Sequence, residues 1–313
     1  MKILYMGTPD FAASILEKIC ETDNEIVGVL TQPDKPRGRG YELSQSPVKK
    51  LALEKGIAVY QPETLKDEAF LPELEKLAPE LIIVAAYGKI LPKYVLDFPP
   101  HGCINVHGSL LPKYRGAAPI QRSIIDGEKK TGITIMKMAE GLDTGDMMIK
   151  GEVDILENDN FEDIHDKLAL CAGDLIVEAI KLISEGKDTY EFQDDSLATY
   201  AEKITKADCF IDFNMSSEQV HNRIRGLSPI PLAYGMLDSK IIKFLSSQII
   251  DKDTVYDDDE VGTIISTDSS VITVACKYGS VGITGVLPEG KKRMSSAEFI
   301  RGKQGLTGQK FSK

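Results

Sequence analysis

The chain has 313 residues, with 37 Lys and Arg against 48 Asp and Glu, a formal net charge of −11, and 42% hydrophobic residues. This balance is typical of globular proteins and argues against disorder, collagen and low-complexity chains. The longest apolar run, Leu81–Ala86, is too short to span a membrane, and the apolar run near the N-terminus is too short for a signal peptide. We therefore expect one or two domains in the cytoplasm, with no membrane partner.

The first 190 residues alternate between strand-like and helix-like segments. The predicted strands are Lys2–Met6, Glu25–Leu30, Ala58–Tyr60, Leu81–Ala86, Cys103–Val106 and Ile133–Met138. The predicted helices are Phe11–Glu21, Pro47–Lys55, Leu71–Leu77, Pro119–Ile125 and Phe161–Ser184. This alternation is typical of an α/β fold with a mostly parallel sheet, in which ligands bind at the carboxyl ends of the strands.

The periodic pattern fades after residue 189, and the polar residues that follow predict a linker over residues 190–208. A helix is predicted over Ser217–Arg225. Short β-branched runs then predict a small barrel or sandwich, with strands at Lys240–Ser246, Gly262–Ser266, Val271–Ala275 and Val281–Val286. We therefore expect one domain over residues 1–189 and a second over residues 209–313.

Five scattered cysteines without a C-x-x-C pair indicate buried thiols rather than disulfides, and we expect no metal site. The overall acidity argues mildly against a nucleic-acid partner. The charge is unevenly distributed along this acidic chain, because residues 277–313 carry 8 Lys and Arg against 2 Asp and Glu. A basic end is most often only a solvated surface, although it also suits a partner that carries phosphates.

The segment Pro33–Ser46 is the second basic region, with Lys35, Arg37 and Arg39 among glycines and prolines. We expect no regular element here, because the segment is long, charged and rich in glycine. It is either a mobile surface loop or a segment that binds phosphates through its basic side chains.

A polar pair, Asn105 and His107, stands at the end of a predicted strand, and both side chains point to the same side of the sheet. Asp143 follows the next strand between two glycines, so its loop can bend back toward the pair. The three groups suit acyl transfer: the amide stabilises an oxyanion, the imidazole accepts a proton, and the carboxylate orients the imidazole. Structural roles are the competing explanation, since Asn and Asp beside glycine usually form turns.

Several stretches of the chain resemble the methionyl-tRNA formyltransferase family: Gly7-Thr-Pro-Asp-Phe11, Asn105–Gly116, Gly141–Asp146 and Thr199-Tyr-Ala-Glu-Lys203. The resemblance implies a Rossmann-like formyltransferase domain followed by a small OB-like β-barrel that helps to hold tRNA. It also implies the reaction, in which the formyl group of 10-formyltetrahydrofolate is transferred to the α-amine of methionine on initiator methionyl-tRNA. The product, N-formylmethionyl-tRNA, serves translation initiation, and we expect the enzyme to be a monomer.

The resemblance also implies roles for individual residues. The family's catalytic triad falls on Asn105, His107 and Asp143. Its folate-binding segment falls on Ser109, Leu110, Leu111 and Pro112, although the two leucines fit a packed core equally well. The tRNA-binding residues are then Lys35, Arg37 and Arg39. Position 230 is Ile where relatives often carry Trp, a change we expect to affect packing rather than chemistry.

Three alternative functions are weighed against this interpretation. A relative that formylates a small amine, such as a nucleotide-linked sugar or glycinamide ribonucleotide, would share the triad, because the acceptor is chosen elsewhere. A non-catalytic RNA-binding protein is disfavoured by the intact triad. A nicotinamide oxidoreductase is disfavoured because Gly7-Thr-Pro-Asp10 has only one glycine of a G-x-G-x-x-G fingerprint.

Overall fold

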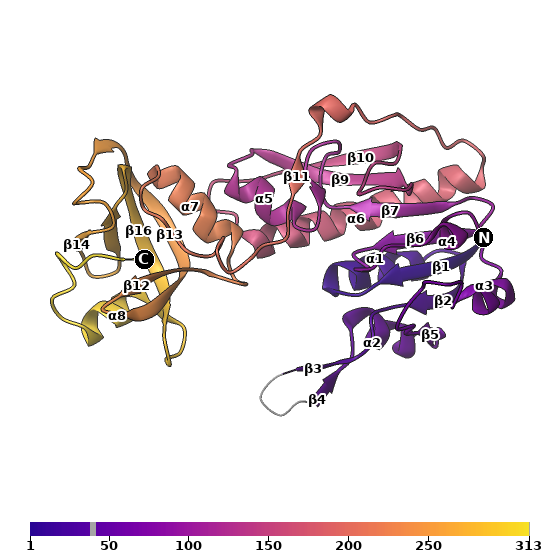
Figure 1. Ribbon diagram of the computed structural model, residues 1–313, viewed down its shortest axis with the longest axis horizontal. Coiled ribbons are helices and arrows are strands. Elements are labelled where there is room, and N and C mark those ends of the chain that lie inside the picture. Colours follow the sequence, from indigo (N-terminus) through magenta and orange to yellow (C-terminus); the bar gives the residue numbers. More distant parts are fainter. Residues whose placement is uncertain (38–41, 313) are drawn as a thin grey trace. The chain divides into compact units, whose positions relative to one another are not determined.

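The computed structural model describes residues 1–37 and 42–312, and it divides into two compact units (Figure 1). The first unit comprises Met1–Gly116, Thr131–Val153 and His165–Tyr200. The second unit comprises Ala117–Lys130, Asp154–Ile164 and the chain from Ala201 onward. The chain therefore passes between the two units several times. Within the described ranges, no helix is long and apolar enough to cross a membrane.

The first unit is built on a seven-stranded sheet in the order β10-β9-β7-β6-β1-β2-β5. Its parallel strands are β1 (Lys2–Gly7), β2 (Glu25–Leu30), β5 (Val59–Tyr60), β6 (Leu81–Ala85) and β7 (Cys103–His107). Strand β9 (Lys130–Lys137) pairs with β7 in the antiparallel direction, and β10 (Met147–Asp154) is the edge strand. The predicted mostly parallel sheet is confirmed, and the order of its strands reverses between β1 and β6, as in doubly wound folds.

Four helices of the first unit follow the predicted apolar periodicity: α1 (Asp10–Cys20), α2 (Pro47–Glu54), α3 (Leu71–Leu77) and most of α6 (Phe161–Ser184). The short helix α4 (Lys93–Leu96) is one that the sequence pattern does not predict. Helix α1 buries Phe11, Ile15, Leu16 and Ile19 on one face. Helix α2 begins at Pro47, because the Ser46 side chain accepts a hydrogen bond from the Lys49 amide and caps the first turn.

A short antiparallel pair of strands lies in the basic segment. Strands β3 (Lys35–Arg37) and β4 (Glu42–Ser44) pair with Lys35 opposite Ser44. The expectation of no regular element between residues 33 and 46 is therefore wrong. An antiparallel ladder pairs the backbone groups of a hydrophilic segment with one another, so no buried apolar face is needed.

The second unit contains an antiparallel sheet in the order β12-β13-β16-β15-β14, with β17 beside β16. The bounds are β12 (Ala233–Leu237), β13 (Lys240–Val255), β14 (Ile264–Thr267), β15 (Ile272–Ala275), β16 (Tyr278–Pro288) and β17 (Met294–Ser295). The C-terminal segment joins the two edges of this sheet. The amide of Gly308 donates to Ile264 of β14, and the amide of Ser312 donates to Met236 of β12. The predicted OB-like barrel is therefore confirmed.

The interior of the barrel is apolar and includes three phenylalanines. The ring centroids of Phe244 and Phe311 are 5.3 Å apart, and those of Phe213 and Phe311 are 5.6 Å apart. Helices α5 (Pro119–Ile125), α7 (Ser217–Gly226) and α8 (Ser296–Gly302) belong to the same unit. Ile230 is 66% exposed, and the expectation that Ile in place of Trp affects packing at residue 230 stays a prediction.

His221 of α7 is buried in the second unit. Its Nδ1 lies 2.9 Å from Ser247 Oγ, and its Nε2 lies 3.1 Å from the carbonyl oxygen of Glu157. Burial lowers the pKa of His221, the hydrogen bond to Glu157 opposes this effect, and the nearby Arg225 guanidinium lowers the pKa further. The folded protein therefore favours the neutral imidazole.

We predict that the free energy of unfolding falls as the pH is lowered from about 7 to about 5. The unfolded histidine, with a pKa of about 6.5, takes up a proton before the folded one does. The stabilisation by neutral His221 is therefore complete above that value and is lost as the pH falls. A His221→Gln variant should show a shallower dependence, by at most about 1.4 kcal/mol per pH unit. Urea unfolding at three pH values measures both slopes, and equal slopes would contradict the prediction.

Candidate active site

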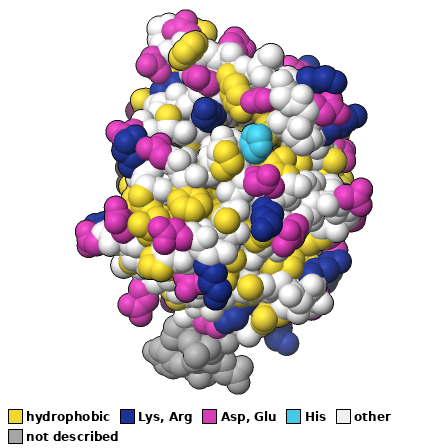
Figure 2. Space-filling view, turned by 90° about the vertical axis from the view of Figure 1, so that its right-hand side faces the viewer, with side chains coloured by type: hydrophobic (Ala, Val, Ile, Leu, Met, Phe, Trp, Pro, Cys, Tyr) yellow, Lys and Arg dark blue, Asp and Glu magenta, His cyan; other side chains and the backbone are white. Residues whose placement is uncertain are grey.

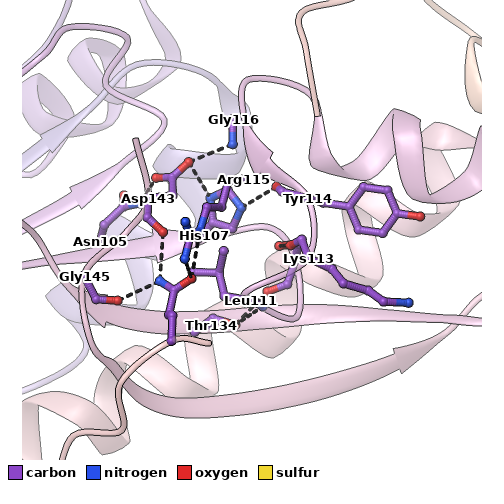
Figure 3. A network of polar contacts seen from close by, with 12 residues as sticks. Asn105, His107, Leu111, Lys113, Tyr114, Arg115, Gly116, Thr134, Asp143 and Gly145 are labelled. Atoms are coloured by element: carbon purple, nitrogen blue, oxygen red, sulfur yellow. Dashed lines mark hydrogen bonds and ion pairs between the residues drawn. The ribbon is translucent and has the colours of Figure 1, made fainter. Parts of the chain in front are cut away.

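Asn105, His107 and Asp143 converge at one end of the first unit's sheet (Figure 3). The Asn105 Nδ2 donates to Asp143 Oδ1 at 3.5 Å, and His107 Nδ1 lies 3.5 Å from Asp143 Oδ2. Asn105 and His107 come from β7, so the rigid sheet positions both of them. The structure thus brings together the three predicted triad residues at long contact distances, which leave room for adjustment when substrates bind.

The contact that His107 Nε2 makes determines which of the two ring nitrogens can take up a proton. His107 Nε2 lies 2.9 Å from the carbonyl oxygen of Tyr114. Because a carbonyl only accepts, Nε2 carries a hydrogen in this contact. The nitrogen that is free to accept a proton is therefore Nδ1, which faces Asp143. A proton that arrives there creates an imidazolium beside a carboxylate.

Asp143 reaches this position because its loop folds back over the sheet. Strand β9 runs antiparallel to β7, and Lys137 at its end lies opposite Ile104 at the start of β7. The loop over residues 138–146 begins and ends beside Lys137, whose amide donates to the Asp146 carbonyl at 2.8 Å, and Asp143 within it reaches Asn105 and His107. Asp143 has a left-handed backbone, with φ of 51°, and its Oδ2 accepts a hydrogen bond from the Gly116 amide at 2.9 Å. Asp tolerates this conformation better than most residues.

The predicted folate segment follows β7 directly as a tight turn. The Ser109 hydroxyl donates to the Lys113 carbonyl at 2.6 Å, and Leu111 packs with two methionines of β9 and β10. Ser109 and Leu111 are only 0% and 2% exposed, so a ligand reaches this turn through the partly exposed Leu110 and Pro112. The folate role of these four residues stays a prediction.

The predicted tRNA-binding residues are described only in part. Lys35 is exposed on β3, the side chain of Arg37 is not described, and Arg39 lies outside the described residues. The base of the β3–β4 pair is held by Lys49, whose Nζ donates to Asp34 Oδ2 at 2.6 Å. This hydrogen bond lowers the pKa of Asp34, and a second one from Gln61 adds to the effect. The ammonium of Lys49 thus anchors the start of the basic segment.

Sequence reasoning missed the residues that support the triad. The Gln193 Nε2 donates to the carbonyls of Asp143 and Gly145 at 2.8 and 2.7 Å, although residue 193 falls in the predicted linker. Tyr114 and Gly116 contact the triad through backbone atoms. No periodicity reveals such contacts, because they join segments that are far apart in the sequence.

Comparisons with known proteins show which family this chain belongs to. Residues 1–180 match the family Formyl transferase, and residues 203–304 match Formyl transferase, C-terminal domain. The chain therefore belongs to the formyl transferase family.

Its relatives include methionyl-tRNA formyltransferases. Those of Clostridioides difficile (strain 630) and Geotalea daltonii are 45% and 43% identical, over 98% and 99% of this chain and 99% and 98% of theirs. An N-formyltransferase from Helicobacter canadensis, solved in complex with folinic acid and dTDP-3-aminofucose, shares the fold. Its TM-score is 0.68 and its identity 20%, over 90% of this chain and 98% of that one.

We predict that Gly145→Ala lowers the rate of formyl transfer about 100-fold, because a displacement of about 1 Å in an active site has an effect of this size. A Cβ at residue 145 would lie 1.7 Å from the carbonyl oxygen of Lys137, so the Asp143 loop must move. Gly302→Ala is the matched control, because its Cβ would meet no described atom within 4 Å. Rates of both variants would be compared with wild type, and an unchanged rate for Gly145→Ala would contradict the prediction.

Proposed function

We propose that this enzyme transfers the formyl group of 10-formyltetrahydrofolate to the α-amine of methionine on initiator methionyl-tRNA, in the cytoplasm. The product is N-formylmethionyl-tRNA for translation initiation. One observation carries the proposal: the similarity to methionyl-tRNA formyltransferases at 45% and 43% identity extends over nearly the full length of each chain. A match limited to the first 180 residues would have left the acceptor open.

The proposed mechanism uses the three converging side chains. The neutral amine attacks the formyl carbon, and the Asn105 amide donates a hydrogen bond to the oxyanion that develops. His107 Nδ1 accepts the proton that the amine loses, and the Asp143 carboxylate, 3.5 Å from that nitrogen, stabilises the imidazolium. The bond from the formyl carbon to the donor nitrogen then breaks. His107 returns its proton to that nitrogen, which restores the neutral imidazole.

The donor is proposed to bind beside the turn Ser109–Pro112. Two observations support a fit. The turn follows the catalytic strand directly, and its conformation is held from inside by Thr134, whose hydroxyl donates to the Ser109 carbonyl at 2.7 Å and accepts from the Leu111 amide at 3.1 Å. A rigid turn with a partly exposed proline suits a flat apolar ring.

The acceptor tRNA is proposed to contact Lys35, Arg37 and Arg39, and the domain over residues 209–313 is proposed to hold the rest of it. Lys35 is exposed on β3, as phosphate binding requires. The face of the molecule in Figure 2 has Lys and Arg interspersed with Asp and Glu, so the described residues form no broad basic area there. The proposal that tRNA binds here therefore rests on the basic segment Pro33–Ser46 and on the basic residues between 277 and 313.

We predict that Asn105→Ala and His107→Ala each lower the single-turnover rate of formyl transfer, by about 10²–10³-fold for the lost oxyanion donor. His101→Ala is the control, because this exposed histidine lies before the same strand and outside the triad. Rapid-quench measurements with bound substrates separate chemistry from binding. Wild-type rates in the Asn105 and His107 variants would refute the mechanism.

We also predict that tRNA binding weakens steeply with salt, because phosphate contacts displace counterions. Replacing Lys35, Arg37 and Arg39 together by Ala should reduce the slope of log K against log salt by about 0.7–0.9 for each phosphate that is no longer neutralised. The control replaces three exposed lysines of the same unit, Lys50, Lys55 and Lys66. A flat salt response in wild type would instead favour a small amine as the acceptor.

A further inference from the structure

Two loops meet at the triad, and each one supports a different member. The loop after β7 contains Tyr114, whose carbonyl contacts His107, and it includes the two-residue strand β8 (Arg115–Gly116), where the Gly116 amide donates to Asp143. The loop after β9 contains Asp143 itself. The relative position of these loops therefore sets the contact between the imidazole and the carboxylate.

Gln193 bridges the two loops with a single amide group. Its Nε2 donates to the carbonyls of Asp143 and Gly145, at 2.8 and 2.7 Å. Its Oε1 accepts from Arg115, in the other loop, through Nε at 3.0 Å and Nη2 at 2.8 Å. Four hydrogen bonds thus meet at one side chain, two on each side.

Arg115 is almost fully buried, with 2% exposure. Among the described residues, its carboxylate partner is Asp195, whose Oδ1 lies 2.7 Å from Nη2 and whose side chain is 83% exposed. A buried guanidinium needs acceptors for its N–H groups, and Gln193 provides one that receives two of them. The pair is therefore coupled, and removing the Gln193 side-chain oxygen takes away an acceptor of the buried guanidinium.

The segment that carries Gln193 is fastened on both sides. Glu191 and Met147 exchange two backbone hydrogen bonds, at 2.8 and 2.9 Å. The Thr199 hydroxyl accepts from the Tyr114 amide, and its carbonyl accepts from the Arg115 amide, both at 2.9 Å. These hydrogen bonds hold Gln193 in place between the two loops.

An amide is well suited to this place because it accepts on one side and donates on the other. A glutamate would have acceptors only, and it would place an oxygen against the carbonyls of Asp143 and Gly145. A methionine would fill the same volume but would form none of the four hydrogen bonds.

We propose that Gln193 is a positioning residue for formyl transfer, which together with Arg115 holds the Asp143 carboxylate in contact with His107. The inference rests on the proposed function of the triad, since Gln193 acts through Asp143. Gln193 thus has a role in the reaction although it lies outside both strand β7 and the loop that carries Asp143.

The first test is the kinetics of Gln193→Glu. We expect kcat to fall about 10–100-fold, as for supporting hydrogen bonds removed at other sites, with the KM for methionyl-tRNA changed less than about threefold. Glu191→Gln, an exposed change on the same segment, should leave both values unchanged. An unchanged kcat in Gln193→Glu, or a loss confined to KM, would overturn the proposal. Gln193→Met replaces this variant if it does not fold.

The second test does not depend on the substrate. The chain has 4 histidines, so ring cross-peaks in a carbon–proton correlation spectrum can be assigned by single substitutions. We expect Gln193→Glu to move the cross-peak of His107 and to leave those of His101, His165 and His221 in place. If wild type does not formylate methionyl-tRNA, the proposed function fails, yet this spectrum still tests the positioning. A stationary His107 cross-peak would overturn the inference.

Discussion

The carboxylate of Asp143 is held by groups from separate parts of the chain, and the proposed active site depends on those contacts. The Gly116 amide donates to one of its oxygens at 2.9 Å, and Asn105 and His107 lie at 3.5 Å. The sheet fixes two of these partners, whereas the carboxylate itself stands on a loop. A loop that carries a reactive group needs support from outside, because its own backbone has few partners.

The fold explains how this support arises. A doubly wound sheet presents the ends of its parallel strands at one edge, which places Asn105 and His107 there. The antiparallel strand β9 then ends at the opposite side, so its loop must return across the sheet. Gly145 allows the loop to approach the Lys137 carbonyl. The Gln193 side chain donates hydrogen bonds to two carbonyls of this loop. The geometry of the proposed triad thus combines two residues on the sheet with one on a loop that hydrogen bonds hold in place.

The sequence predicts most helices and strands of the first unit and the convergence of the triad residues, for physical reasons that differ between elements. Helix α6 and strand β2 have the predicted bounds, because their apolar patterns are long or fully regular. The convergence of Asp143 on β7 follows from the glycines around it. The role of Gln193 and the closure of the barrel by residues 308–312 do not follow, because both depend on hydrogen bonds between distant segments. Strand β12 is short and contains a glycine, so local preference alone does not reveal it.

The reaction proposed for this chain is formylation of the methionine of a charged initiator tRNA. The most direct measurement follows a labelled formyl group from 10-formyltetrahydrofolate, with charged initiator tRNA, charged elongator tRNA and small amines offered as acceptors in parallel. We expect labelled N-formylmethionine from the initiator tRNA, with far less label on the elongator tRNA and the small amines. Label on a small amine in preference to the initiator tRNA, or on no acceptor, would contradict this proposal.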